Sequence, residues 1–561
     1  MIILSDFCYS YNNDLAAKPA LNNISLKISA GEYISIMGPN GSGKSTLGKI
    51  ISGIIPSQGE AFNFKNINAA SEEGNRLVRN STGMVFQNPD NQMVAMTVES
   101  EIAFPLENIC TPSGEIREKV DRLIDTFKLE MFVDRPPLLL SGGERQKVII
   151  ASVLAGEPEC LILDEPTSLL DPQGRKYIMT LLEDIFGRKG EFSHLWIKKD
   201  IAPTIINITQ FPEEAFLSER LIVMDEGNIV YDDSPESVFK RVFDDDSGII
   251  PLPKLFQYEL VKMKQGLLPE TSSIQNNTSA VASGHAYIMK DIYFSYKLPW
   301  GDIIPALNEF NCEIQKGRVT GLMGITGSGK SSAARLMAFL EKPDRGSIIF
   351  NDEEIAKHVS IETKRKAGLS FQFPERQFFC ETVYDEIAFA LKLRGTDKAL
   401  IDRAVKESLG LVGLEYTDFV SRDPFTLSGG EKRRIGIAIT LAMAPEVVIL
   451  DEPTSGLDGE GIGYLIKLIS NLTAKNKTII IISHNLEFIL NVCDDILFFT
   501  EGRVSGKSTV EKILQGAFPI EKQGIILTEY IGYVIKTACN SDILLKSLPS
   551  PEEFFILSHG Y

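Results

Sequence analysis

Short runs of apolar residues alternate along this chain with segments that have a helical pattern. Residues 33–37 form an apolar run that leads into a glycine-rich loop, and residues 160–163 form another that leads into an aspartate. Residues 45–51 have a helical pattern, and residues 478–482 form a further short apolar run. Strands that alternate with helices in this way predict an α/β fold, with a parallel sheet covered by helices.

One ordered set of motifs occurs twice. The spacing from lysine to glutamine is 43 residues in the first copy and 42 in the second, and the spacing from serine to aspartate is 23 in both. The repeat period of 286 residues is far too long for a solenoid, so we expect a duplicated domain. The landmarks are Lys44, Gln87, Ser141 and Asp164 in the first copy and Lys330, Gln372, Ser428 and Asp451 in the second.

The repeat sets the predicted domain boundaries. We expect a first domain over 1–231, a tail and linker over 232–285, and a second domain over 286–506. Residues 269–284 are polar and small, which is typical of a flexible linker. Residues 507–561 form a C-terminal extension for which the sequence indicates no chemistry.

Composition and charge narrow the possible functions. With 43% hydrophobic and 24% charged residues, the chain is typical of soluble globular proteins. It has no apolar run near the ~20 residues that a membrane-spanning helix needs, and no basic leader precedes its first apolar residues. The net charge of −18 argues against a nucleic-acid binder held by bulk electrostatics, but it allows a nucleotide ligand.

The seven cysteines are scattered and include no C-x-x-C pair, so we expect buried free thiols in a reducing compartment and no zinc or cluster site.

Two segments, 38–45 and 324–331, match the phosphate-binding loop pattern G-x-x-x-x-G-K-[ST]. Glycines let successive amides point at the phosphates, and the helix that follows adds its positive end. The lysine supplies charge and the serine hydroxyl ligates Mg²⁺. The predicted nucleotide-binding residues are Gly38, Asn40, Gly41, Gly43, Lys44, Ser45 and Thr46, and then Gly324, Thr326, Gly327, Gly329, Lys330, Ser331 and Ser332.

An Asp-Glu pair ends an apolar run in each copy. Asp164 and Asp451 are predicted to hold Mg²⁺ through water, and Glu165 and Glu452 to orient or deprotonate the attacking water. Both pairs continue into Pro-Thr-Ser, which makes a chance match improbable. The predicted metal ligands are Ser45, Gln87 and Asp164, and Ser331, Gln372 and Asp451.

A third motif is LSGGERQK at 140–147 and LSGGEKRR at 427–434. Ser-Gly-Gly at the start of a helix is a second anion-binding surface. One nucleotide does not need two phosphate-binding surfaces from the same unit, so we expect the second surface to bind the nucleotide of the neighbouring unit. With these motifs the sequence resembles the ATP-binding cassette (ABC) ATPases, whose signature is Leu-Ser-Gly-Gly-Gln. The fifth position departs from that pattern, because it is Glu144 or Glu431. The residues concerned are Ser141, Gly142, Gly143, Ser428, Gly429 and Gly430.

This resemblance implies that the two domains pack head to tail with two ATP molecules between them. Lys44 would share its nucleotide with Ser428, and Lys330 with Ser141. Tyr11 and Tyr296 lie upstream of the glycine loops, where the corresponding aromatic residue of ABC ATPases stacks on adenine. The alternative for each tyrosine is packing on the edge of the sheet.

Gln87 and Gln372 carry amides that could reach both Mg²⁺ and the attacking water. The residues that follow them, through Thr-Val and Glu-Ile-Ala-Phe, resemble energy-coupling factor (ECF) transporters, which import vitamins or nickel and cobalt ions. That resemblance implies that Asp90 and Glu375 face basic residues of a transmembrane partner. The alternative is an acidic residue exposed to solvent.

The two copies differ at the end of the motif series. Residues 204–210 align with 478–484, which places Gln210 opposite His484. Histidine can donate a positive charge or a proton to the γ-phosphate and glutamine cannot become a cation. We therefore expect the site with Lys330 and His484 to hydrolyse ATP faster. The first copy also has 13 extra residues around 187–200, with no assignable role.

Together these features predict a tandem ABC ATPase at the cytoplasmic face of the membrane that drives an importer, with ATP and Mg²⁺ as ligands and integral membrane subunits as partners. The alternatives are a sugar-type importer ATPase, a soluble ABC protein acting on ribosomes or DNA, and a nucleotide switch without hydrolysis. A separate membrane subunit would select the substrate. The predicted catalytic residues are Glu165, Glu452, His484, Gln210, Gln87 and Gln372.

Overall fold

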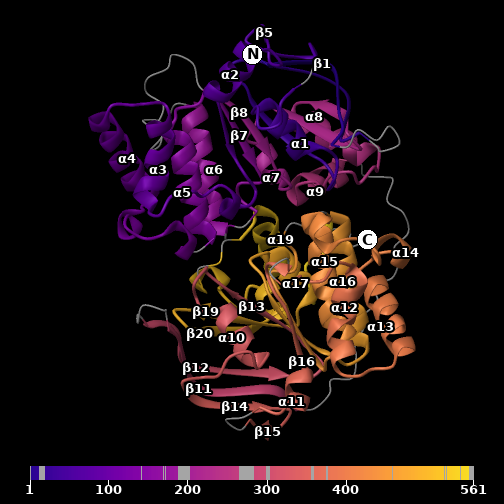
Figure 1. Ribbon diagram of the computed structural model, residues 1–561. Helices are drawn as coiled ribbons and strands as arrows, with labels where there is room; N and C mark the ends of the chain where they lie inside the picture. Colours follow the sequence, from indigo (N-terminus) through magenta and orange to yellow (C-terminus); the bar gives the residue numbers. More distant parts are fainter. Residues whose placement is uncertain are drawn as a thin grey trace. The chain divides into compact units, whose positions relative to one another are not determined.

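The structure is a computed structural model of the whole chain (Figure 1). It describes residues 2–11, 19–57, 59–140, 142–168, 170, 172–187, 203–263, 284–297, 303–355, 359–374, 377–455, 457, 459–523, 525, 527–541, 543, 545–551, 553 and 554. The chain divides into two compact units, 1–253 and 254–561. The predicted 187–200 insertion and the 269–284 linker lie almost entirely outside the described residues.

The first unit contains two sheets. A six-stranded sheet has the order β10-β9-β3-β8-β7-β6, parallel except for its edge strand β10, and a four-stranded antiparallel sheet has the order β2-β1-β4-β5. The strands are β1 (Ile2–Tyr9), β2 (Leu21–Ile28), β3 (Tyr33–Met37), β4 (Phe62–Phe64), β5 (Ile67–Asn68), β6 (Thr82–Val85), β7 (Cys160–Asp164), β8 (Thr204–Ile208), β9 (Arg220–Asp225) and β10 (Asn228–Asp233).

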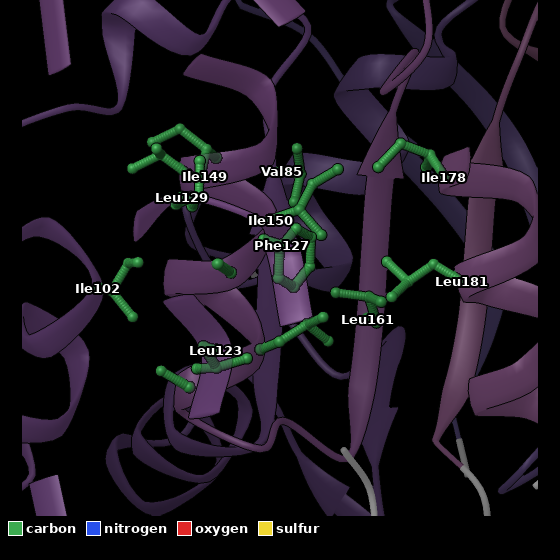
Figure 2. Packing of buried hydrophobic residues seen from close by; sticks show 14 of the residues in the cluster. Val85, Ile102, Leu123, Phe127, Leu129, Ile149, Ile150, Leu161, Ile178 and Leu181 are labelled. Atoms are coloured by element: carbon green, nitrogen blue, oxygen red, sulfur yellow. The ribbon is translucent and has the colours of Figure 1, made fainter. Parts of the chain in front are cut away.

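Helices cover both faces of this six-stranded sheet. The helices are α1 (Lys44–Ile51), α2 (Glu72–Ser81), α3 (Val98–Asn108), α4 (Ser113–Phe127), α5 (Gly142–Ala155), α6 (Pro172–Gly187), α7 (Pro212–Ala215) and α8 (Pro235–Asp244). One face packs on α3 to α6, and the other packs on α1 and the antiparallel sheet. Figure 2 shows the first of these cores, where Phe127, Ile150 and Leu161 meet between helices and sheet.

The second unit repeats this arrangement. Its six-stranded sheet has the order β16-β17-β18-β13-β19-β20, and its antiparallel sheet has the order β12-β11-β14-β15. The strands are β11 (His285–Lys297), β12 (Ile303–Gln315), β13 (Val319–Gly324), β14 (Arg345–Phe350), β15 (Glu353–Glu354), β16 (Ala367–Ser370), β17 (Val447–Asp451), β18 (Thr478–Ile482), β19 (Asp495–Thr500) and β20 (Arg503–Thr509).

The helices of the second unit follow the same plan, with additions at both ends of the unit. They are α9 (Lys254–Met263), α10 (Lys330–Met337), α11 (Ile361–Arg365), α12 (Val383–Leu393), α13 (Lys398–Leu411), α14 (Tyr416–Phe419), α15 (Gly429–Ala442), α16 (Gly459–Ala474), α17 (Leu486–Val492), α18 (Val510–Leu514) and α19 (Glu529–Ser541). In Figure 1, α12, α13 and α15 stand together beside the sheet of this unit.

The α/β class with a parallel, helix-covered sheet is confirmed in both units. The predicted apolar runs are strands β3, β7 and β18, and the helical pattern over 45–51 is α1. The antiparallel sheets were not predicted. Their strands alternate buried and exposed residues, as in β2, so they lack the continuous apolar runs that mark a strand buried on both faces.

The chain around the predicted linker and the C-terminal extension belongs to the second unit. Helix α9 precedes the linker in sequence, yet the Tyr258 ring lies 5.3 Å from that of Tyr533 and 5.8 Å from that of Phe554. The Lys254 ammonium also lies 3.0 Å from the Glu487 carboxylate in α17. The extension and α9 therefore share one aromatic cluster on the second unit.

All seven cysteines are free. The expectation that they are buried is wrong for three of them, because Cys8, Cys110 and Cys539 are exposed. Cys110 follows the end of α3 and has a positive φ of 56°. The buried cysteines are Cys160, Cys312 and Cys493.

Candidate functional site

The glycine loops of the two units have the same conformation. The Lys44 ammonium donates to the carbonyl oxygens of Gly38 and Pro39 at 2.8 Å each. Lys330 does the same with Gly324 and Ile325, also at 2.8 Å each. Each lysine is therefore folded back over its own loop, and two of the three protons of its ammonium group are donated to loop carbonyl oxygens.

Glycine is required at the first position of each loop. Gly38 has φ +148°, and a Cβ there would lie 2.0 Å from the carbonyl oxygen of Met224. Gly324 has φ +151°, and its Cβ would lie 2.3 Å from the carbonyl oxygen of Phe499. The loops thus form backbone cradles that begin α1 and α10 and suit a phosphate group.

A hydroxyl and a carboxylate meet beside each cradle. The Ser45 hydroxyl donates to Asp164 at 3.0 Å, and Ser331 forms the corresponding hydrogen bond with Asp451. Burial raises the pKa of both aspartates, and the serine hydrogen bond opposes that shift. Oxygen donors of this kind, completed by phosphate oxygens, fit Mg²⁺, which keeps few protein ligands in phosphate sites.

In the first unit the structure brings three predicted catalytic residues together. Both carboxylate oxygens of Glu165 are occupied, because the Gln87 amide donates to one at 2.7 Å and the Gln210 amide donates to the other at 2.6 Å. Gln210 also donates to the Asn40 side chain at 3.3 Å. The glutamine at this position therefore bridges the glycine loop and the glutamate.

In the second unit His484 contacts the side chain of the corresponding glutamate, Glu452. His484 Nε2 lies 3.4 Å from Glu452 Oε1, and the His484 backbone N–H donates to Glu452 Oε2 at 3.3 Å. The 3.4 Å contact is too poorly aligned to be a hydrogen bond, since Oε1 is buried without such a partner among the described residues. Within that part of the chain, no counterpart of the Gln87–Glu165 bond joins Gln372 to Glu452.

The two glutamates share an unusual backbone and an unusual acidity. Both have φ 49°, a left-handed conformation rarely adopted by a residue other than glycine. Burial, reinforced by the neighbouring aspartate, raises the pKa of Glu165 and of Glu452 to about 7. A carboxyl group with a pKa near neutrality can accept a proton from water at the pH where an enzyme works.

The two tyrosines lie over the start of the loop helices. The Tyr11 hydroxyl is 3.1 Å from the Thr46 hydroxyl, and the Tyr296 hydroxyl is 3.2 Å from that of Ser332. Tyr11 is 60% exposed, so its ring is accessible to a ligand. This placement is compatible with the predicted stacking on adenine.

The second signature motif begins α15 with a capping box. Ser428 accepts from the Glu431 backbone N–H at 3.3 Å, and the Glu431 carboxylate accepts from the Ser428 backbone N–H at 2.8 Å. The departure from the family's glutamine thus preserves the cap. Gly429 has open space around its Cα, as does Gly142 in the first unit, whereas Gly143 would contact Leu170 at 3.4 Å. Ser141 lies outside the described residues.

The acidic residue after Gln87 is engaged within its own unit. The Asp90 carboxylate pairs with the guanidinium of Arg145, which belongs to the signature helix α5. Asp90 is therefore neither simply solvated nor free, and Gln87's loop is linked to α5. Glu375, its counterpart, lies outside the described residues.

Sequence reasoning missed the role of a glutamate in each Glu-Ile-Ala-Phe segment. Glu101 is 2% exposed and accepts backbone N–H groups of Val94 and Ala95 at 2.9 and 2.7 Å. Glu386 accepts those of Phe379 and Cys380 at 3.0 and 2.8 Å. These carboxylates fix the loop ahead of α3 and α12. The signal was in the sequence, because a glutamate occurs at the same position of the Glu-Ile-Ala-Phe segment in both copies.

Two further buried residues gave no sequence signal. Glu214 is 2% exposed in the first unit, and Arg433 is 8% exposed in the second. Neither has a matching residue in the other unit, so the repeat did not identify them.

Two P-loop cradles, each with an Asp-Glu pair at the end of a central strand, define a P-loop NTPase with two nucleotide-binding domains. The family model described as "ABC transporter" matches residues 21–168 and 307–455. The chain belongs to this ABC transporter family, and its two ABC ATPase domains hydrolyse ATP. No helix within the described ranges is long and apolar enough to cross a membrane.

Relatives match the chain over nearly its whole length. It is 32% identical to a "Putative ABC transporter ATP-binding protein" of Caldanaerobacter subterraneus subsp. tengcongensis, over 92% of both chains. It is 31% identical to the "Putative HMP/thiamine import ATP-binding protein YkoD" of Bacillus subtilis, over 89% of both. A solved structure from Clostridium perfringens, "cbiO1", described as part of an ABC transporter complex, aligns at 28% identity with a TM-score of 0.38, over 45% of this chain and 100% of that one.

Proposed function

We propose that this chain is the ATP-hydrolysing subunit of an importer and that its two ATP sites work at unequal rates. Glu452 would orient the attacking water, and His484 would donate to the γ-phosphate. At the other site, Gln210 and Gln87 hold both oxygens of Glu165, so that carboxylate must be released before it can act. Mg²⁺, when held by Ser45 and Asp164 or by Ser331 and Asp451, would supply positive charge beside the phosphates.

In the proposed cycle the two units close on two ATP molecules, as the family resemblance implies. Ser428 would complete the site of Lys44, and Ser141 that of Lys330. Glu165 and Glu452 both have an αL backbone, and each carboxyl interacts electrostatically with the lysine of its own glycine loop. We expect each carboxylate to hold a water against the γ-phosphate. Hydrolysis would then reopen the units.

The observation that carries the importer proposal is a pair of exposed apolar residues at matched positions in both units. Val94 and Phe379 both lie seven residues after the predicted glutamine and are 64% and 61% exposed. Phe104 and Phe389 follow in α3 and α12, at 42% and 39% exposure, and the Phe379 and Phe389 rings are 4.6 Å apart. Exposed apolar groups that recur in this way are typical of an interaction surface.

We propose that these two surfaces dock membrane subunits at the cytoplasmic face of the membrane. Glu101 and Glu386 hold the loop of each surface rigid, so a force applied there would reach Gln87 or Gln372. The ECF resemblance after the two glutamines favours a micronutrient importer. The name of the Bacillus relative makes HMP and thiamine the first substrates to test, with nickel and cobalt ions second.

The test is copurification of the tagged chain from detergent-solubilised membranes, together with uptake in vesicles rebuilt from what copurifies. We expect integral membrane proteins in the eluate and ATP-dependent uptake of one of these substrates. Phe379→Asp with Phe389→Asp, which alters the second unit's surface, should lower the yield of copurified membrane protein and leave ATP binding by the purified chain unchanged. Copurification of ribosomal RNA, with no membrane protein, would overturn the proposal in favour of a ribosome-associated ABC protein.

A further inference from the structure

In the second unit, a buried arginine joins the signature helix to the predicted catalytic glutamate. Arg433 is 8% exposed and lies in α15, the helix that Ser428 caps. Its Nη1 donates to the backbone carbonyl oxygen of Glu452 at 2.5 Å. Arg433 lies five positions after Ser428, so the Cα atoms of these two residues are about 7.5 Å apart along the axis of the helix.

The first unit makes this connection differently. Gln146 occupies the position of Arg433, is 1% exposed, and its Nε2 has no hydrogen-bond partner among the described residues. The carbonyl oxygen of Glu165 accepts instead from the Ser168 hydroxyl, three residues along the same loop, at 3.0 Å. In both units this carbonyl also accepts from the backbone N–H three residues on, that of Ser168 at 3.2 Å or of Ser455 at 3.3 Å. The contact from the signature helix is therefore an addition in the second unit.

The contacted carbonyl is well placed to control the glutamate side chain. Glu452 has the left-handed φ of 49°, and its backbone N–H donates to Ile482 at 2.9 Å. Residue 452 is therefore fixed on one side by β18 and on the other by Arg433 and the Ser455 backbone N–H. Without Arg433 this carbonyl would keep the longer bond from Ser455, and the strained backbone that carries the carboxylate would be less firmly held.

We propose that Arg433 is a positioning residue, which ties the helix capped by Ser428 to the backbone of Glu452 and makes turnover at Glu452 depend on nucleotide at Ser428. The second half of this statement rests on the proposed function, in which Ser428 completes the site of Lys44. Glu452 belongs to the site of Lys330. Through Arg433, ATP bound at the site of Lys44 would affect hydrolysis at the site of Lys330. The reverse effect is not expected, because Gln146 of the first unit does not make the corresponding contact with Glu165 in the described part of the chain.

The test uses the full chain with Glu165→Gln, which leaves Glu452 as the hydrolysing carboxylate. In that background we expect Arg433→Gln to lower kcat about tenfold, the loss of one hydrogen bond to a charged group, with KM for ATP unchanged. Arg433→Lys, which keeps the charge, should recover part of the rate. Arg403→Gln removes an arginine from an exposed ion pair on α13 and is the matched control that should change nothing.

The directional part is tested with a double-mutant cycle. Ser428→Ala should lower kcat at Glu452 when Arg433 is present and have little further effect in Arg433→Gln. Equal effects of Ser428→Ala in both backgrounds would overturn the coupling, and an unchanged kcat in Arg433→Gln would overturn the positioning role. If Arg433→Gln does not fold, Arg433→Lys takes its place in the same cycle, and additive losses count against the proposal.

One control separates this inference from the proposed function. The double variant Glu165→Gln with Glu452→Gln should have almost no ATPase activity. If it remains active, the roles proposed for the two glutamates are wrong. If it is inactive while Arg433→Gln behaves as its parent, only the inference about Arg433 fails.

Discussion

The loop after the proposed catalytic glutamate is held by a buried carboxylate, Glu214, in the first unit, whereas the second unit has the apolar residue Phe488 at the matching position. In the first unit the buried Glu214 carboxylate accepts from the hydroxyls of Thr167 and Thr209 at 2.5 and 2.6 Å. Its Oε1 also lies 3.9 Å from the Arg175 guanidinium in α6. Thr167 follows Glu165 closely and Thr209 precedes Gln210, so one carboxylate ties the two loops of the site together.

In the second unit the matching positions are apolar. Phe488 stands in place of Glu214, and Ile462 in place of Arg175. Phe488 is 3% exposed, and the two loops meet through the Thr454 and Ser483 hydroxyls, 3.5 Å apart. Both members of the ion pair, Glu214 and Arg175, are thus apolar residues in the second unit. Replacing both members together leaves no buried charge without a partner.

Two units with the same motifs therefore hold their proposed catalytic glutamates in different ways. Glu165 is clamped by two amides, in a loop tied to that of Gln210. Glu452 contacts one histidine, in a loop tied to the signature helix by Arg433. Two side-chain amides thus hold the Glu165 carboxylate, whereas His484 contacts the Glu452 carboxylate through its ring and its backbone N–H.

The largest expected effect is on the ATPase rate, and it tests whether the two ATP sites hydrolyse ATP at different rates. Glu452→Gln should lower the ATPase rate on the order of a thousandfold, because it removes the proposed general base of the faster site. Glu165→Gln should leave most of the activity. Steady-state phosphate release from the purified chain measures both, and equal losses would contradict the unequal pair.

The buried charge in the first unit gives the next largest effect, on stability. Glu214→Ala should destabilise the first unit by about 3 kcal/mol, the lower end of the cost of removing one partner from a buried ion pair. Replacing both partners with the residues of the second unit, Glu214→Phe with Arg175→Ile, should recover most of this loss. Calorimetry of the full chain follows the first unit's transition, and a double variant less stable than Glu214→Ala would contradict the exchange.

Substitutions of His484 and Gln210 compare the contributions of these two residues to the ATPase rate. His484→Ala should lower the ATPase rate about a hundredfold, as expected for loss of one transition-state donor. Gln210→Ala should have a much smaller effect, because that site contributes little to turnover. Gln210→His should raise the rate of a chain that carries Glu452→Gln. Equal losses for the two alanine variants, measured in one assay, would exclude the proposed asymmetry.

The smallest expected effect concerns the loop serines. Ser168→Ala should destabilise the first unit by about 1 kcal/mol, because it removes the hydroxyl that holds the Glu165 carbonyl. Ser455→Ala should change the second unit's stability much less, since Arg433 holds that carbonyl. Denaturant unfolding of the two variants tests the difference, and a larger loss for Ser455→Ala would reverse it.

Much of the site was predictable because P-loop chemistry is local in sequence. Gly38, Lys44 and Ser45 lie within eight residues, and the φ that Gly38 requires is a property of the loop itself. The strands β3, β7 and β18 were also predictable, because a strand buried on both faces is apolar throughout. The strands of the antiparallel sheets alternate and were not found.

The sequence by itself determined the duplicated ATPase, its glycine loops, its acidic pairs and the difference between Gln210 and His484. Only the tertiary structure decided how each glutamate is held, since the partners come from residues distant in the chain. Glu214 reaches back 47 residues to Thr167, and Arg433 reaches forward 19 residues to Glu452. A buried charge is stabilised by whatever polar group the fold brings within reach, and no local pattern encodes that group.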